Sequence, residues 1–185
     1  MFLRPHVLTL IVFCFVGVTV FIGMGHAAET YRNAKYGFSV EVPTGVKLCR
    51  EPPPNPDHGP ALLLESSISC EAPSDAEPSI HVNAGFNSIE EQNLEELKNY
   101  TCNGSGSPGT VPNGLRISGH KTESCLVKSG NGQVEVWIVA QVSRGAFIDG
   151  WINYEVCLVT TESRLDKDLL TLRRVLAGIR LFKPL

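Results

Sequence analysis

The chain has 185 residues, of which 43% are hydrophobic and 19% are charged, and its formal net charge is −3. With two Trp and eight Phe it can bury a substantial core, which excludes a disordered protein. The small negative charge argues against a general nucleic-acid binder, because such proteins normally carry a strong basic excess. We therefore expect one globular domain and no nucleic acid among its partners.

The first 28 residues have the order of a secretory signal peptide. Arg4 precedes an uncharged apolar segment, 7–25, and small residues up to Ala28 follow it. This order is typical of a leader that is cleaved on export, here after Ala28 or the residue before it. The alternative is an uncleaved anchor, because 19 uncharged residues can just span a bilayer. The small residues before the cleavage position favour cleavage. A cleaved leader predicts a periplasmic or secreted domain, 29–185, with no stable membrane insertion.

Five cysteines remain after that cleavage, and an exported protein keeps its disulfides. The simplest pairing joins Cys49 to Cys70 and Cys102 to Cys125, and each bridge would contribute about 3 kcal/mol by closing a loop of about 20 residues. Cys157 is then the odd thiol, in a β-rich run where it would be a small buried side chain. No pair has the C-x-x-C spacing of a zinc site or a dithiol redox motif.

Alternating apolar and polar residues predict the strands of the first half, as in the segment 30–43 with its Phe38, Val40 and Val42. The predicted strands lie within 30–43, 46–51, 61–67 and 79–86. Between the second and the third of these, the segment 52–60 holds five prolines in nine residues. Proline fixes φ and lacks a backbone donor, so this segment is predicted to be an extended surface loop.

A helix is predicted to follow, because Ser88 and Glu91 have the spacing of a capping box. It should run to about Tyr100, with Leu94 and Leu97 on its buried side. The acidic residues of its first turn suit the positive end of the helix dipole.

The second half begins with a loop rich in Gly, Ser and Pro, 103–114. Strands are then predicted over 115–118, 123–128, 133–143 and 151–161, with a hairpin turn at 129–132. An amphipathic helix from Ser163 to about Arg180 closes the chain, with Leu165, Leu169, Leu172, Leu176 and Ile179 on one face. This order predicts an α+β domain in which an antiparallel β-sheet is packed by helices.

The opening segment from Tyr31 to Pro43, which reads YRNAKYGFSVEVP, resembles the start of PsbP-like domains. The chain also ends like them, in an amphipathic helix placed at 166–181. The resemblance spans nearly the whole mature chain and implies an α/β/α sandwich around an antiparallel sheet. It departs from the family at Val46, where an aromatic often stands, and in its five cysteines and its proline loop.

The PsbP-like family includes photosystem-associated proteins, bacterial envelope proteins and binding modules, and most members have no known enzyme activity. The same fold resembles some periplasmic immunity proteins, which neutralise lytic effectors delivered by neighbouring cells. The resemblance therefore implies a function in binding rather than in catalysis, by analogy of fold alone.

No motif in the chain fixes a reaction. Residues 104–109 match G-x-G-x-x-G, but a helix precedes them and a strand follows, which is the reverse of a phosphate-binding loop. His58, His81 and His120 are isolated in sequence, whereas a zinc site needs three or four converging ligands. We predict no catalytic, metal or cofactor residues. Two alternatives stay open: an envelope hydrolase using His58 or His81, and a carrier of a lipid or small ligand with an apolar pocket between helix and sheet.

These observations together predict a non-catalytic binding protein of the cell envelope that contacts a protein partner, for example as an immunity protein. Residues 29–112 hold 5 basic and 12 acidic side chains, and residues 113–185 hold 10 and 7. An acidic patch would steer a basic partner, unless the two halves interleave in the sheet. The candidate contact loops are 52–60, 103–114 and 144–151. The candidate partner-binding residues are Pro54, Asp57, His58, Glu90, Glu91, Glu95, Phe147 and Trp151.

Overall fold

The computed structural model describes residues 29–50, 57–65, 67–71, 77–87, 93–102, 107–109, 111, 114–143 and 151–185. The predicted leader, 1–28, lies outside this set. Within the described residues, no helix has the length and apolarity to cross a membrane. The elements are β1 Thr30–Asn33, β2 Phe38–Glu41, β3 Lys47–Cys49, β4 Ala61–Leu63, β5 Ser79–Phe86, α1 Leu94–Cys102, β6 Ser107–Gly109, β7 Glu123–Lys128, β8 Gln133–Ser143, β9 Trp151–Thr161, α2 Leu165–Gly178 and β10 Ile179–Leu181.

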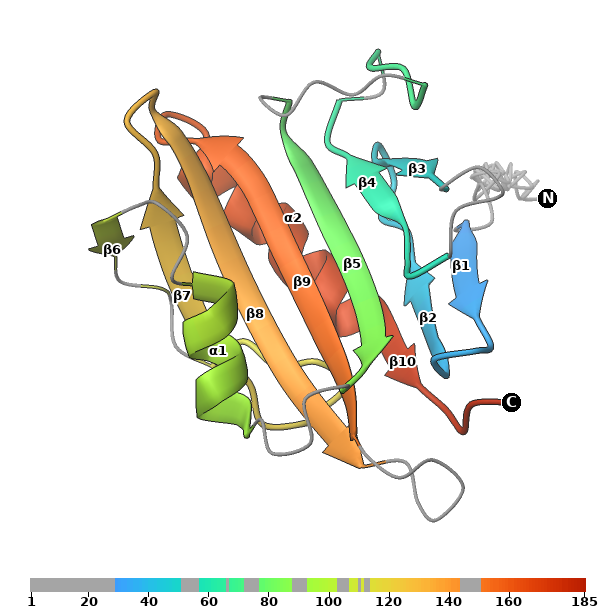
Figure 1. The fold of residues 1–185 in the computed structure, drawn as a ribbon. Coiled ribbons are helices and arrows are strands. Elements are labelled where there is room, and N and C mark those ends of the chain that lie inside the picture. Colours follow the sequence, from blue (N-terminus) through green and yellow to red (C-terminus); the bar gives the residue numbers. More distant parts are fainter. Residues whose placement is uncertain are drawn as a thin grey trace, which may run out of the picture.

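The strands form two antiparallel sheets (Figure 1). The large sheet has the order β3-β4-β5-β9-β8-β7-β6, with the long strands β5, β9 and β8 at its centre. The small sheet has the order β1-β2-β10 and joins the first strands of the domain to the last. We predicted one antiparallel sheet packed by helices, so the α+β class is confirmed and the number of sheets is corrected to two.

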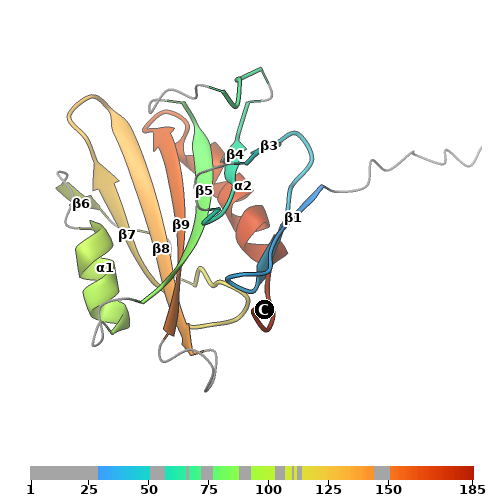
Figure 2. The ribbon, with the colours of Figure 1, turned by 45° about the vertical axis from the view of Figure 1, so that its right-hand side comes forward.

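The two helices lie on opposite faces of the large sheet (Figure 2). Helix α1 covers β7 and β8 on one face, and α2 packs behind β9 on the other, next to the small sheet. This arrangement is the predicted α/β/α sandwich. Among the described residues, α2 contacts β9 on one face, and on the other face α1 contacts β7 and β8 while no described helix covers β5 and β9.

The core lies between the large sheet, α2 and the small sheet. Even-numbered positions of β8, such as Val136 and Ile138, are fully buried, and so are Leu172 and Val175 of α2. Burying a side chain of this size contributes about 2 kcal/mol relative to leaving it exposed. The layer between α2 and the sheet is therefore solid core, which counts against the carrier alternative because that function needs a deep pocket there.

The first helix starts later than predicted. Asn93 is the N-cap of α1: its side-chain Oδ1 accepts hydrogen bonds of 3.0 Å from the backbone N–H groups of Glu95 and Glu96. The Glu96 carboxylate in turn accepts the Asn93 N–H at 3.0 Å, which completes a capping box. The predicted N-cap, Ser88, was therefore wrong for this helix, and it lies outside the described residues.

The last helix ends earlier than predicted. Helix α2 stops at Gly178, and Ile179–Leu181 forms β10, which pairs antiparallel with β2. At Gly178 an added Cβ would lie 2.9 Å from the backbone oxygen of Glu41, so the chain passes directly over β2 here. Ile179 was assigned to the helical face, but it is buried as a strand residue of the small sheet.

Three shorter segments also differ from the prediction. The loop 103–114 contains a short strand, β6, which pairs with β7. The predicted strand 115–118 is a turn with a single bridge between Ile117 and His120. The strand predicted over 61–67 ends at Leu63. Strands β5, β7, β8 and β9 have the predicted bounds.

Both predicted disulfides are present. Cys49 of β3 is bonded to Cys70, and Cys102 at the end of α1 is bonded to Cys125 of β7. The second bond fixes α1 to the face of the sheet that it covers. Cys157 is a buried free thiol, as predicted.

Candidate functional site

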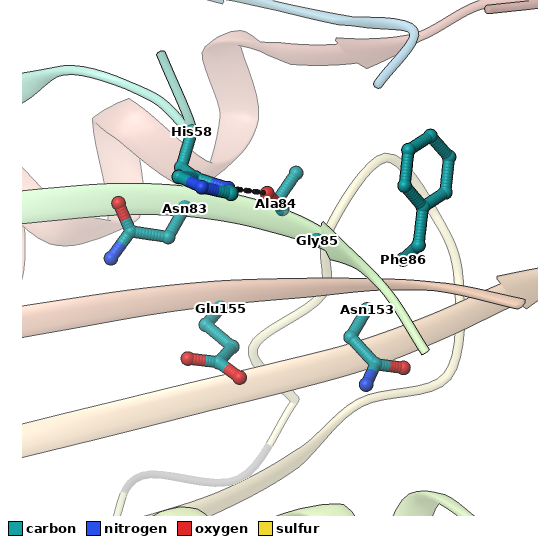
Figure 3. Close-up of a pocket in the computed structure, with 7 residues that line it drawn as sticks. All are labelled: His58, Asn83, Ala84, Gly85, Phe86, Asn153 and Glu155. Carbon is teal, nitrogen blue, oxygen red and sulfur yellow. Dashed lines mark hydrogen bonds between the residues drawn. The ribbon is translucent and has the colours of Figure 1, made fainter. Parts of the chain in front are cut away.

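The candidate site is a hollow on the uncovered part of the large sheet, where β5 and β9 lie side by side (Figure 3). Residues that face each other across an antiparallel pair project to the same face. Asn83 of β5 lies opposite Glu155 of β9, and Gly85 lies opposite Asn153. We call this site the Gly85 hollow, and its lining consists of His58, Asn83, Ala84, Gly85, Phe86, Asn153 and Glu155.

The missing side chain of Gly85 opens the hollow. A Cβ placed on Gly85 would have no neighbour within 4 Å, so nothing in the described structure fills the space above it. The resulting depression has a volume of about 390 Å³ and is open to solvent. A glycine inside a strand weakens the strand and often marks the close approach of a ligand or another backbone.

The segment Asp57–Pro60 supplies one wall of the hollow. It continues the line of β4 along β5: Ala84 N–H donates to the His58 carbonyl oxygen at 2.9 Å, and Val82 N–H donates to Pro60 at 3.1 Å. Gly59 lies against β5 at φ +155°, where an added Cβ would be 1.7 Å from the Val82 oxygen. The described end of the proline loop is thus an extended segment held on the sheet, and Gly59 is required for its approach.

The ring of His58 is oriented by hydrogen bonding and stacking. Its Nδ1 lies 3.1 Å from the carbonyl oxygen of Ala84 and 3.1 Å from the hydroxyl of Tyr36. The Tyr36 ring stacks on His58 with centroids 5.5 Å apart and contacts Phe86 at 5.1 Å. A carbonyl oxygen can only accept a hydrogen bond, so the contact with Ala84 requires Nδ1 to be the donor, and Nε2 forms no hydrogen bond with a described residue.

Asp57 has a structural role beside the hollow. The Tyr31 hydroxyl donates a short hydrogen bond to its carboxylate, and the Asn33 amide donates to its backbone oxygen at 2.8 Å. Burial, together with this hydrogen bond to Asp57, raises the pKa of Tyr31 well above its ordinary value. Asp57 therefore anchors the segment that carries His58 to β1, and its carboxylate is already engaged.

Glu155 is the acidic group of the hollow. It is half-buried in the middle of β9, and burial raises the pKa of its carboxyl group. It lies opposite Val139 of β8, which is fully buried. Among the described residues Glu155 forms no ion pair or hydrogen bond through its side chain. The hollow thus holds an acidic group that has no side-chain partner among the described residues.

Two large exposed aromatic side chains lie where β5 ends and β9 begins. Phe86 lines the hollow, but it lies opposite Ile152, one position after Gly85, and so projects to the other face of the sheet, where its ring contacts Tyr36. Phe86 is 41% exposed and Trp151 is 47% exposed. Asn87 N–H donates to the Trp151 carbonyl oxygen at 2.8 Å, which brings the ends of β5 and β9 together. Trp151 is two residues from Asn153 along β9 and therefore projects to the same face.

The structure brings together only some of the predicted partner-binding residues. Asp57, His58 and Trp151 lie at or beside the hollow. Glu95 lies elsewhere, at the exposed start of α1, in a depression that it shares with Lys98 and Lys121. The acidic first half and the basic second half therefore interleave here. The remaining four, Pro54, Glu90, Glu91 and Phe147, lie outside the described residues.

Sequence reasoning missed Asn83, Gly85, Asn153 and Glu155. They lie in segments that are predicted to be strands, and that prediction uses only the apolar positions of each strand. The available signal was a glycine inside a strand pattern, together with polar residues at the outward positions of two neighbouring strands.

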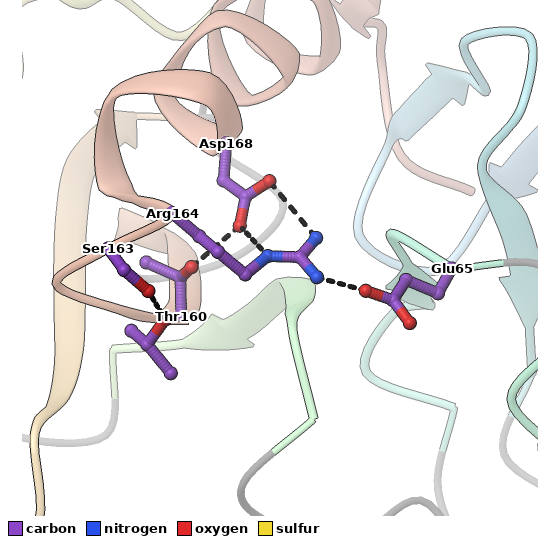
Figure 4. A network of polar contacts seen from close by, with 6 residues as sticks. Glu65, Thr160, Ser163, Arg164 and Asp168 are labelled. Atoms are coloured by element: carbon purple, nitrogen blue, oxygen red, sulfur yellow. Dashed lines mark hydrogen bonds and ion pairs between the residues drawn. The ribbon is translucent and has the colours of Figure 1, made fainter.

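A second polar cluster lies at the other end of the sheet, where α2 begins (Figure 4). Asp168 of α2 is buried, and its carboxylate accepts hydrogen bonds from the Thr160 hydroxyl at 2.6 Å and from Arg164 Nε at 3.1 Å. Arg164 also forms a short ion pair with Glu65. We call this cluster, Glu65, Thr160, Arg164 and Asp168, the α2 anchor. Its groups satisfy one another, so it holds the helix on the sheet.

The described residues also include a serine–histidine contact, between Ser79 Oγ and His81 Nε2 at 3.0 Å. Ser79 is only 5% exposed, so no substrate carbonyl can reach its hydroxyl in this structure. Within the part of the chain that the structure describes, no group of three or more His, Cys, Asp or Glu side chains converges on a metal position.

The chain is similar to three solved structures of other proteins. The solution structure of cyanobacterial PsbP (CyanoP) from Synechocystis sp. PCC 6803 matches with a TM-score of 0.52 and 15% identity, over 86% of this chain and 96% of that chain. LpqN, described as involved in cell envelope biogenesis of Mycobacterium tuberculosis, matches at 0.49 and 8% identity, over 86% and 87%. A point mutant of Mog1 matches at 0.48 and 16% identity, over 84% and 96%.

No family model matches the chain, and no curated protein matches it in sequence. At 15% identity the match to CyanoP concerns the arrangement of helices and strands and carries nothing about activity. It agrees with the resemblance of the opening strand and with the layers described above. The chain therefore has the PsbP-like fold.

Proposed function

We propose that the protein is an exported, non-catalytic binding protein of the cell envelope, which acts by contact with a protein partner at the Gly85 hollow. The observation that carries the proposal is the exposed aromatic side chain of Trp151, on the same face of the sheet as Asn153 and Glu155 of the polar hollow. Aromatic residues are enriched at the centres of protein interfaces because they bury large areas at small entropic cost.

The extracytoplasmic location is supported by the two disulfides. Such bonds persist in the periplasm and outside the cell, and they are rare in the cytosol, where thiols are kept reduced. The order of residues in the leader points the same way.

The lining of the hollow favours binding over hydrolysis. His58 and Glu155 lie there with two asparagines, an alanine, a glycine and a phenylalanine. A serine- or cysteine-type hydrolase needs a hydroxyl or thiol within hydrogen-bond reach of a base, and the described lining holds neither group. A turnover screen against esters, peptides and glycan fragments tests this. Activity that disappears in a His58→Ala variant would replace the binding function by a hydrolase.

Site-specific photocrosslinking tests the proposed contact surface. Benzoylphenylalanine replaces Trp151 in one full-length exported protein and Leu170 in another. Leu170 is a matched control because it is also a large exposed apolar residue, 60% exposed, on α2. We expect an adduct with one envelope protein from position 151 only, and excess unlabelled protein should compete it away. No adduct from position 151, or equal adducts from both positions, would contradict the proposal.

An immunity protein is one specific form of this function. It predicts that the purified protein inhibits a secreted lytic enzyme encoded beside its own gene, at equimolar ratio. An enzyme that digests cell-wall material at the same rate with and without the protein would exclude this form and leave the broader binding function standing.

A further inference from the structure

Within the described part of the chain, Glu155 lacks a partner in a place where a carboxylate normally has one. A half-buried charge loses part of its hydration, and this loss is ordinarily offset by an ion pair or by hydrogen bonds. The other acidic side chains of the same face have such contacts: Glu135 accepts the Trp137 indole N–H at 2.9 Å, and Glu123 lies 3.6 Å from Lys121. Glu155 has neither within the described structure.

The other free groups around Glu155 are hydrogen-bond acceptors or can act as such. The Asn83 amide lies directly across from Glu155 and forms no side-chain hydrogen bond with any described residue. His58 Nδ1 lies 3.1 Å from the Ala84 carbonyl oxygen, and in the tautomer that donates there the Nε2 atom can accept a hydrogen bond. A cationic ligand with several N–H donors matches this set.

The electrostatic surroundings favour a cation. Burial, with the charges of Glu135 and Glu155, raises the pKa of Cys157, which lies between them on the same face. Two carboxylates, those of Glu135 and Glu155, therefore lie on this part of the sheet, and both attract a cation. Lys35 is close to the aromatic rings, 5.9 Å from the Phe86 centroid, but it forms no ion pair with Glu155 in the described structure.

We infer that the Gly85 hollow receives an arginine side chain from a protein partner, an inference that rests on the proposed function. Glu155 would accept a bidentate pair of hydrogen bonds from the guanidinium, and Asn83 Oδ1 and His58 Nε2 would accept others. A guanidinium is flat and carries five donors and no acceptor, which suits a shallow site lined by acceptors. A lysine ammonium is more strongly hydrated and lacks the planar fork.

Titration with N-acetyl-arginine amide tests the inference without the natural partner. The full exported protein, labelled with ¹⁵N, is titrated with this probe and, in parallel, with N-acetyl-lysine amide. We expect the arginine probe to shift the signals of Asn83, Gly85, Asn153 and the Trp151 indole, and to bind more tightly than the lysine probe. Equal binding of the two probes, or shifts elsewhere on the molecule, would overturn the inference.

Two variants locate the binding. Glu155→Gln removes the charge and keeps the shape, and it should raise the Kd for the arginine probe about tenfold, the usual loss for a charge-assisted hydrogen-bond pair. Glu123→Gln is the matched control, because Glu123 and Glu155 both lie opposite Val139 and the change in net charge is the same. A Kd that rises equally in both variants would show a general charge effect and contradict the inference.

Gly85→Val provides a second route that removes no charge. The valine fills open space, so the fold should be retained while the probe is excluded. Unchanged binding by a folded Gly85→Val protein would overturn the inference.

The proposed function and the arginine site would be contradicted by different results. A partner that crosslinks to position 151 and binds wild type and Glu155→Gln equally refutes the arginine site alone, whereas a missing partner refutes the proposed function whatever the probe does.

Discussion

Asp168 and Glu155 are both carboxylates partly or fully removed from water, and the protein treats them differently. Asp168 is 2% exposed and has Thr160 and Arg164 as donors, with Glu65 balancing the second side of the guanidinium. Glu155 is half-buried, lies on the uncovered part of the sheet and has no such donor among the described residues. The α2 anchor supplies its own counter-charge, and the Gly85 hollow does not.

The difference in hydrogen-bond partners between Asp168 and Glu155 distinguishes a carboxylate that stabilises the fold from one that is available to a ligand. A buried charge is tolerated when the fold provides its partners, and such a cluster then fixes one geometry. A charge left without partners weakens the isolated fold, and it is consistent with selection for something the isolated protein does not contain. Changes in the anchor should therefore alter stability and leave binding intact, and changes in the hollow should do the reverse.

The largest effect is expected from Asp168→Ala. Removing the carboxylate leaves the Thr160 hydroxyl and the Arg164 guanidinium without their acceptor at a buried position, which should lower the free energy of unfolding by about 4 kcal/mol. Urea denaturation measures it, with Asp166→Ala as the control, since Asp166 is exposed in the same helical turn. A loss below about 1 kcal/mol would show that the anchor is dispensable. The folded variant should bind the arginine probe as wild type does.

The next effect concerns the disulfide that fixes α1. The double variant Cys102→Ala, Cys125→Ala opens a loop with a sequence separation of 23 residues, and it should lower stability by about 3 kcal/mol. Because the hollow lies on β5 and β9, away from β7, the Kd for the arginine probe should not change. Denaturation of the double variant with and without reductant, followed by titration, checks both statements. A probe affinity that falls with the disulfide would mean that α1 helps to form the hollow.

Sequence patterns were sufficient to predict the bounds of those elements in which apolar residues recur at a fixed short spacing along the chain. Apolar and polar residues alternate along most of the eleven residues of β8 and of β9, and this alternation predicted where each strand begins and ends. The end of α2 could not be found this way. Ile179 continues the apolar period of the helix, and only its pairing with Val40 of β2 shows that it belongs to a strand. Likewise, Ser88–Glu91 and Asn93–Glu96 both fit a capping box, and tertiary contacts select the second.

The candidate site was predictable in its loops and not in its strands. His58 and Trp151 were proposed because they lie in or next to a predicted loop, and both lie at the hollow. Glu155 has no local signature that separates it from any outward strand residue. Its position opposite Asn83, and near a glycine that leaves space, depends on the register of β5 with β9. That register joins segments far apart in the chain, and no local pattern encodes it.

A smaller effect is expected on the pH dependence of stability. Burial raises the pKa of Glu155 in the folded protein above its value in the unfolded chain, so the folded state holds this proton more tightly. Its contribution to stability is therefore present at acid pH and lost as the pH rises through the carboxyl range. Glu155→Gln should be more stable than wild type by about 0.5 kcal/mol at neutral pH, and the difference should vanish in acid. Urea midpoints of both proteins at about pH 4 and pH 7 measure it. A difference of the opposite sign would indicate that Glu155 has a counter-charge in the folded state.

The smallest effect on stability, and the sharpest contrast between two positions, is expected at the glycines. Gly85→Val should change the free energy of unfolding by no more than about 0.5 kcal/mol, because valine favours strands and its side chain enters open space. Gly59→Ala should cost more than about 2 kcal/mol, because its Cβ would collide with the Val82 oxygen. Denaturation curves for the two variants measure this difference directly. A Gly85→Val protein as unstable as Gly59→Ala would mean that the space above Gly85 is needed by the fold, and the hollow would then be a packing feature rather than a place for a partner.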